Sequence, residues 1–207
     1  MITSTPTPPP DVTTSTEPDT RRLLNGSCLT TRGAYAALAS QLTDPSLSQI
    51  WDSKVPKKVM IFGWLFYLDR LNTRANLLKK HILQTAVCPR CNNHVEDRDH
   101  LFFTCPAARR IWRALGLKPR FNPTADLFVT AIPAVLPSSV RSFMLLLFLW
   151  KIWDARNKKV FQNLEIDVKT TVKAILEDLI LWTHRLKTAA LKEHAGLWRD
   201  FLSSRIL

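Results

Sequence analysis

The sequence predicts a mainly α-helical protein: a small helical module, a helical hairpin that follows it, and a disordered leader at the N-terminus. Apolar residues recur at helical spacings of three and four along much of the chain, and no segment predicts a strand. Residues such as Pro56, Pro106 and Gly116 stand where helices would begin or end. We place the three segments at residues 1–27, 28–120 and 121–207.

The leader is rich in Ser, Thr and Pro and has almost nothing to bury. Such a segment cannot offset the entropy that it would lose on ordering, so we expect it to be disordered. The stretch 32–42 is rich in Ala, Tyr and Leu and predicts a short helix, which ends at the turn signal Asp44-Pro45.

Two helices are expected next. Pro56 suits the first turn of a helix over 59–68, which is apolar nearly all round and should therefore be buried. Thr73 can cap a second helix that runs to about residue 83. That helix has an inward apolar face and an outward basic one, formed by Leu78 and Ile82 and by Lys79 and Lys80.

A third helix should begin at Pro106, with Thr104 or Cys105 as its cap, and end at Gly116. Its inner side is apolar and its outer side is basic. The inner residues are Ala108, Ile111, Trp112 and Leu115, and the outer residues are Arg109, Arg110 and Arg113.

The C-terminal region begins with a linker that prolines punctuate, with one short helix near 124–131. Two longer helices are expected, over 139–162 and 167–189. The second carries an apolar stripe at spacings of four and three, which is typical of a packed helical hairpin and less often of a coiled coil. The stripe consists of Val168, Val172, Ile175, Leu179, Trp182 and Leu186.

Basic residues are concentrated in a third of the chain. The net charge is +12, and residues 54–120 hold fourteen Lys or Arg against four Asp or Glu. A polyanion, most often nucleic acid, is the usual partner of such a block, and a solvated basic face that only aids solubility is the alternative. No Gly-rich loop could cradle phosphates.

The longest apolar run, 143–150, is much shorter than the roughly 20 residues that cross a bilayer. No signal segment begins the chain. We therefore expect a soluble, intracellular protein without a membrane partner.

Three of the four cysteines have, together with one histidine, the spacing of a metal site. Cys88, Cys91, His100 and Cys105 form the pattern C-x2-C-x8-H-x4-C, in which the close pair places two thiolates on one turn. Zn²⁺ accepts such S and N ligands at about 2.0–2.3 Å. Intracellular cysteines of this kind are more often ligands than disulfide partners. Four protein ligands leave no open position for water, so we expect one structural zinc ion.

Other residues near this cluster have alternative roles. His94 would give a cramped C-x2-C-x2-H spacing and is the less favoured histidine. Cys28 lies far upstream and is interpreted as a free thiol. Asp97 and Asp99 could orient the second ring nitrogen of His100, but helix capping is the favoured interpretation for each of them.

Two blocks of residues resemble a known family. The first block comprises Ile50-Trp51, Lys54-Val55-Pro56-Lys57-Lys58-Val59, Phe62, Trp64 and Arg70-Leu71-Asn72-Thr73-Arg74-Ala75-Asn76-Leu77. The second comprises Cys88-x2-Cys91, Glu96-Asp97, Asp99-His100-Leu101-Phe102, Cys105 and Ile111-Trp112. Together, over about residues 32–117, they resemble the reverse-transcriptase zinc-binding domain at the C-terminal end of plant LINE-type (non-LTR) retrotransposon polyproteins. The later Trp150-Lys-Ile-Trp153-Asp-Ala-Arg156-Asn157 and Phe161 resemble the segment that often follows this domain.

This resemblance implies a zinc-binding module attached to a polymerase, which helps to grip RNA template or target DNA, and it implies a nuclear location. The metal role carries over to Cys88, Cys91, His100 and Cys105. The polymerase does not carry over, because reverse transcriptases use a carboxylate pair, typically in a Tyr/Phe-x-Asp-Asp turn, and this sequence contains no Asp-Asp. No endonuclease or ribonuclease H carboxylate set is recognisable, and no small-molecule substrate is expected.

We therefore expect a non-catalytic, zinc-stabilised module that binds RNA or DNA by contacts to phosphates rather than to bases. The candidate contacts are Lys54, Lys57, Lys58, Arg70, Arg74, Lys79, Lys80, Arg90, Arg109, Arg110 and Arg113. For Arg90 the alternative is that it offsets the negative charge of a Cys₃His zinc site. Three tryptophans could stack on bases, but their helical spacing favours core positions; these are Trp51, Trp64 and Trp112.

Three alternatives stay open. The chain could be a protein-interaction or scaffold module whose hairpin 139–189 binds a partner or self-associates, with Leu147, Trp150 and Trp153 as interface anchors. An enzyme is the weakest alternative, because nothing places a nucleophile, a base and a third group in a recognisable order. The chain could also be a decayed transposon fragment without a selected role.

Overall fold

The computed structural model describes residues 45–118 and 133–205, and their regular structure is helical. In chain order the elements are α2 (Pro45–Asp52), α3 (Lys57–Tyr67), α4 (Arg74–Lys79), the π-helical turn η1 (His100–Thr104), α5 (Pro106–Ala114), the 3-10 turn η3 (Ser138–Val140), α6 (Arg141–Gln162), α7 (Val168–Thr183) and α8 (Ala189–Ser203). Among these residues, the one strand-like pairing is an antiparallel bridge between Val87 and Val95. The mainly α class is confirmed.

Several expectations lie outside the described residues. These are the disordered leader, the helix over 32–42, the short helix near 124–131 and both segment boundaries. In the part of the chain that the structure describes, no helix combines the length and the apolar character of a membrane span.

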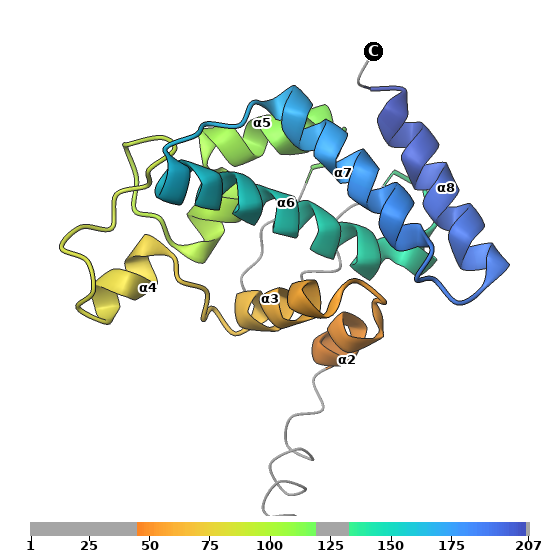
Figure 1. Ribbon diagram of the computed structural model, residues 1–207, viewed down its shortest axis with the longest axis horizontal. Coiled ribbons are helices and arrows are strands. Elements are labelled where there is room, and N and C mark those ends of the chain that lie inside the picture. Colours follow the sequence, from red (N-terminus) through yellow and green to blue (C-terminus); the bar gives the residue numbers. More distant parts are fainter. Residues whose placement is uncertain (1–44, 119–132, 206–207) are drawn as a thin grey trace, which may run out of the picture. The chain divides into compact units, whose positions relative to one another are not determined.

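Helix α6 lies at the centre of the packing. It contacts α2, α3, α7, η1 and η3, and α8 packs in turn on α7. Figure 1 shows α3 on one side of α6, with α5 and α7 on the other. Every side chain from Phe143 to Leu149 is buried, because this stretch of α6 is covered from several directions. The unbroken apolar run in the sequence therefore belongs to a buried helix.

The predicted zinc module and the C-terminal helices share one hydrophobic core. The ring of Phe62 in α3 meets that of Trp150 in α6 edge-on, with centroids 5.4 Å apart. Trp112 in α5 meets Phe148 in α6 in the same way at 6.0 Å. Aromatic pairs of this geometry contribute about 0.5–1.5 kcal/mol each beyond their buried area. The C-terminal helices thus pack against the predicted zinc module through this shared core.

The helix ends agree well with the sequence. The Thr73 side chain accepts a hydrogen bond from the backbone N–H of Asn76 and caps α4. Cys105 is the N-cap residue of α5 and Pro106 follows it. Gly116 ends that helix with a φ of 68°, in the left-handed region that favours glycine. The inner and outer sides of α5 are as predicted, since Ile111 is buried and the three arginines are exposed.

Two helices were not expected from the sequence. Helix α2 begins at Pro45, a residue that we interpreted as the end of the preceding helix. Helix α8 follows Thr188, whose side chain accepts a hydrogen bond from the N–H of Leu191. Its buried face is formed by Ala195, Trp198 and Leu202, spaced three and four residues apart. That spacing and the capping threonine could have predicted α8.

The expected burial of some apolar residues is wrong. Helix α4 ends at Lys79 and His81 takes a positive φ of 57°, so Leu78 and Ile82 do not form an inward face. They are 39% and 63% exposed. Helix α3 is buried on one face only, which leaves Trp64 38% exposed. Trp51 in α2 is also exposed, whereas Trp112 is buried as expected.

Gly63 allows a close approach between α2, α3 and α6. A Cβ at this position would lie 2.6 Å from Cδ2 of Leu146 and 3.3 Å from Cγ2 of Ile50, two core residues. We expect Gly63→Ala to lower the free energy of unfolding by about 1–3 kcal/mol through overpacking, despite the better helix propensity of alanine. Chemical denaturation measures the change. The matched control is Gly196→Ala in α8, where the added Cβ meets nothing within 4 Å. If Gly63→Ala were as stable as this control, the packing described here would be contradicted.

Candidate metal centre

Cys88 and Cys91 lie on a tight turn that backbone hydrogen bonds close. The N–H of Asn92 donates to the carbonyl of Cys88 at 2.9 Å, and Asn92 takes a φ of 52°. The two short segments that flank the turn pair through two backbone hydrogen bonds of 2.8 Å. The N–H of Cys88 donates to the carbonyl of His94, and the N–H of Glu96 donates to the carbonyl of Ala86. We call residues 86–96 the metal ribbon.

His100 and Cys105 lie at the two ends of the π-helical turn η1. The N–H of Cys105 donates to the carbonyl of His100 at 2.7 Å and closes the turn. Asp97 accepts a hydrogen bond from the N–H of His100 at 2.7 Å, so this carboxylate caps η1. Asp99 pairs with the neighbouring Arg98. The His100 Nδ1 atom lies 3.4 Å from the Thr104 hydroxyl instead.

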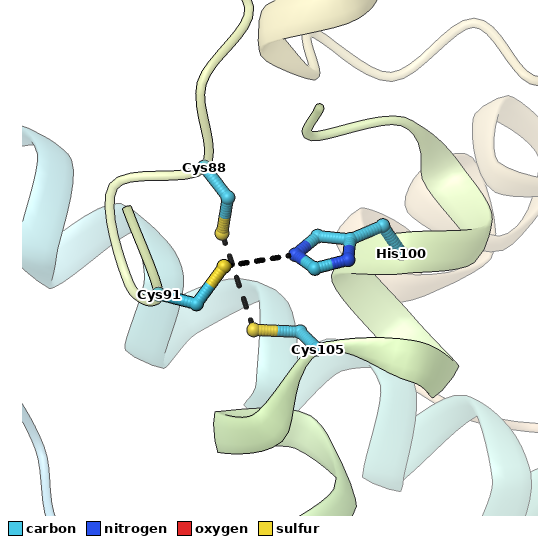
Figure 2. Close-up of side chains that lie close together, drawn as sticks. All are labelled: Cys88, Cys91, His100 and Cys105. Atoms are coloured by element: carbon cyan, nitrogen blue, oxygen red, sulfur yellow. Dashed lines mark hydrogen bonds between the residues drawn. The ribbon is translucent and has the colours of Figure 1, made fainter. Parts of the chain in front are cut away.

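The four side chains converge on one point (Figure 2). The sulfur atoms of Cys88, Cys91 and Cys105 and a ring nitrogen of His100 all lie within 4.8 Å of one another. The Cys88 and Cys105 sulfurs are 3.9 Å apart, and the Cys91 sulfur lies 3.3 Å from His100 Nε2. A tetrahedral zinc ion with bonds of about 2.3 Å to S and about 2.0 Å to N would hold two sulfurs about 3.8 Å apart and S and N about 3.5 Å apart. The arrangement therefore fits a Cys₃His zinc site.

His94 stays outside this cluster. Its ring stacks on that of His100, with centroids 5.3 Å apart, and its side chain is exposed. The structure thus brings His100 rather than His94 to the three cysteines. Cys28 lies outside the described residues.

The surroundings of Cys105 favour its thiolate form. The hydrogen bond from Cys88 lowers the pKa of Cys105 to about 5, and the backbone N–H groups of Ala107 and Ala108 in the first turn of α5 also lower it. The same hydrogen bond and burial raise the pKa of Cys88. The raised pKa of Cys88 and the lowered pKa of Cys105 both come from one proton that the two sulfur atoms share. A divalent cation that replaces the proton can bind both as thiolates.

Arg90 stands between the two cysteines of the turn, and its side chain is buried. Its side chain is 3% exposed and pairs at 3.0 Å with Glu165, in the connection between α6 and α7. Its Nη1 atom is buried without a hydrogen-bond partner. A buried guanidinium here suits the alternative interpretation, in which Arg90 offsets the net negative charge of a Cys₃His zinc site.

A buried ion pair ties the metal ribbon to α6. Glu96 is completely buried, and both of its carboxylate oxygens accept hydrogen bonds from Arg156 of α6, with Nε at 3.1 and 3.2 Å. Glu96 also accepts the backbone N–H of Arg74 at the start of α4. The guanidinium of Arg156 lies 5.0 Å from the ring of Trp153. Both residues belong to motifs of the family resemblance, but the sequence did not indicate that they pair.

The other candidate phosphate contacts lie on α3, α4 and α5 and on the connections next to these helices. Two are half-exposed, Lys54 and Arg74, and the exposed ones are Lys57, Lys58, Arg70, Lys79, Lys80, Arg109, Arg110 and Arg113. The Lys58 ammonium lies over the ring of Trp150 at 5.4 Å. Figure 1 shows α3, α4 and α5 well apart from one another. The candidates therefore do not lie on one helix, and α5 carries three of the exposed ones: Arg109, Arg110 and Arg113.

Comparison with known proteins identifies the segment that carries this site. Residues 29–112 match the family described as zinc-binding in reverse transcriptase. The match includes all four residues of the cluster and confirms the resemblance in the sequence. Residues 29–112 are thus similar to a zinc-binding domain of the reverse-transcriptase type, and four of them form a Cys₃His cluster that could hold a metal ion.

The chain is also similar to a protein of Arabidopsis thaliana named "Putative ribonuclease H protein". The two are 29% identical over 86 residues, which cover 39% of this chain and 14% of that protein. The chain therefore corresponds to only a small part of this relative's length. No solved structure matches the chain.

Proposed function

We propose that this chain is a non-catalytic module, derived from a plant retrotransposon reverse transcriptase, that binds one structural zinc ion and contacts RNA or DNA through phosphates. The observation that carries the proposal is the convergence of four donor atoms within 4.8 Å. A zinc ion bound there would cross-link the metal ribbon, η1 and the start of α5. The site would then hold α5, with its exposed arginines, in a fixed position.

A structural rather than a catalytic metal agrees with the donor set. Three thiolates and one imidazole complete the tetrahedral shell of zinc, so no position is left for a reactive water molecule. Cys88 and Cys105 are completely buried, and His100 is 7% exposed. The sequence adds no Asp-Asp pair that could hold a catalytic magnesium ion.

The charge of α5 supports phosphate contacts. Arg109, Arg110 and Arg113 are exposed, and none of them forms an ion pair with a carboxylate of the described residues. Arginine binds phosphate oxygens through two parallel hydrogen bonds, which makes it well suited to nucleic-acid backbones. Three such residues on one exposed helix are therefore available to a polyanion.

The salt dependence of binding tests this proposal. Each phosphate contact to duplex DNA should contribute about −0.9 to the slope of log affinity against log salt, and each to a single strand about −0.7. We expect a slope of about −2 or steeper for a contact surface of three arginines. Fluorescence anisotropy of a labelled oligonucleotide across a potassium chloride series measures the slope. A flat salt response, or no binding at low salt, would contradict phosphate recognition.

A second candidate function is protein interaction, and the exposed apolar side chains of α2 and α3 favour it. Trp51, Ile61 and Trp64 are 48%, 49% and 38% exposed. The residues that we expected as interface anchors on the C-terminal hairpin belong to the protein's own packing instead. Leu147 is completely buried, and Trp150 and Trp153 pack against the core. Light scattering over a range of protein concentrations tests self-association, and a mass that stays monomeric would count against it.

A further inference from the structure

A pocket of about 580 Å³ lies where the ends of α5 and α8 meet. Its described lining includes two aromatic rings, those of Phe103 and Trp112, which stack at an interplanar angle of 15°. Four cationic side chains complete the lining: Arg109, Arg113, Lys118 and Arg205. Pockets of this size can hold a ligand as large as a nucleotide.

The described residues that line this pocket give it a positive charge. None of the described residues that line it is acidic. None of its four cations forms an ion pair with a carboxylate of the described part of the chain. All four are exposed, so their charges face the pocket and the surrounding water. Like charges that are held together without a counter-charge repel one another, and an anionic ligand relieves that repulsion.

Arg205 is positioned by contacts with the backbone of Gly116 and with the ring of Phe201. A Cβ at Gly116 would lie 2.5 Å from its Cζ and Nη1 atoms, so the guanidinium rests directly against the bare backbone of that glycine. The Cζ atom of Arg205 also lies 4.4 Å from the ring centroid of Phe201 in α8. The glycine takes a φ of 68° at the C-terminal end of α5, where a cation is favoured by the helix dipole. The fold thus brings a cation from the end of the chain to the arginines of α5.

We propose that this pocket binds two phosphate groups carried by one ligand, and that the ligand is a stretch of RNA or DNA backbone. Four cations provide two for each of two adjacent phosphodiesters, and arginine forks match phosphate oxygens. The half-exposed ring of Phe103, backed by the buried ring of Trp112, gives the sugar or base an apolar wall. The inference rests on the proposed nucleic-acid function and assigns it to one place. A free polyphosphate offers the same chemistry, and the experiment separates the two sources.

The test compares two pairs of substitutions that remove the same charge. Arg113→Gln with Arg205→Gln changes the pocket, whereas Lys173→Gln with Lys192→Gln changes two exposed residues that neither line it nor belong to the candidate phosphate contacts. The probe is a fluorescein-labelled homothymidine oligonucleotide, with homouridine RNA as a second probe. We expect the pocket pair to weaken binding about tenfold or more and to reduce the salt slope by about 1.4, two single-strand contacts, while the control pair weakens it about threefold or less.

Each outcome decides between the proposals. If the unchanged protein binds and both pairs weaken binding equally, the pocket assignment is wrong and the proposed function stands. If inorganic tripolyphosphate binds in a way that depends on Arg113 and Arg205 but the oligonucleotides do not bind, the nucleic-acid source is wrong. If neither probe binds the zinc-loaded protein, both proposals fail. Circular dichroism checks that the variants keep their helices, which we expect because all four changed residues are exposed.

Discussion

Replacement of a single zinc ligand is expected to unfold much of the molecule rather than to loosen one turn. The four ligand side chains come from the metal ribbon, η1 and the start of α5, and Cys88 and Cys105 belong to the common core. Structural zinc contributes about 10–16 kcal/mol to the folding of small zinc modules near pH 7. Because a whole domain is stable by only about 5–15 kcal/mol, we expect Cys91→Ser and His100→Ala to lose most of their helical circular dichroism at 25 °C.

The controls use the same substitutions outside the cluster. Cys28→Ser removes the fourth cysteine, and His94→Ala removes the histidine that stacks on His100 without joining the ligand atoms. Both should melt like the unchanged protein. Thermal melting with and without a chelator measures the effect. Ligand variants that melted together with these controls would show that the cluster does not hold the fold.

Loss of the buried guanidinium of Arg156 is expected to be the next largest effect. Arg156→Met would leave the carboxylate of Glu96 buried without its cation, and removal of one partner of a buried pair costs about 3–5 kcal/mol. The double variant Glu96→Gln with Arg156→Met removes the stranded charge and should recover part of this loss, because the penalty comes mainly from the unpaired ion. Urea unfolding in the presence of zinc measures both.

An exposed ion pair provides the matched control for Arg156. Arg199 lies 2.9 Å from Asp200, and these side chains are 49% and 66% exposed. Pairs of this kind contribute about 0–1 kcal/mol, so Arg199→Met should change stability little. Equal effects of the two substitutions would contradict the account in which the Glu96–Arg156 pair holds α6 to the metal ribbon.

Local signals in the sequence predicted much of the fold. A capping side chain or a first-turn proline acts on residues three or four positions away, so a short stretch of sequence is enough to recognise it. The start of α4 after Thr73 and that of α5 at Pro106 were therefore placed correctly. Most of the predicted stripe lies on the buried face of α7, as Ile175 and Leu179 show, although the helix ends at Thr183 rather than near 189 and Leu186 lies beyond it. The Cys₃His cluster was accessible for the same reason, since its spacing of a close pair and two later ligands is specific to metal sites.

What the sequence did not predict depends on tertiary contacts. Trp64 and Phe62 are both apolar and two positions apart, and only the packing of α6 on α3 decides that Phe62 is buried and Trp64 exposed. Glu96 and Arg156 are separated by 60 positions, so nothing local indicates their pairing. Arg205 likewise lies far along the chain from the α5 residues that line the pocket, and only the packing of α8 brings it there.

The central claim is that one zinc ion, bound by three sulfurs and one nitrogen, holds this module together. Metal analysis and zinc X-ray absorption of the purified, unchanged protein test it most directly. We predict one zinc per chain, with three sulfur neighbours at about 2.3 Å and one nitrogen at about 2.0 Å. A folded protein without zinc, or with zinc surrounded mainly by oxygen, would contradict the account.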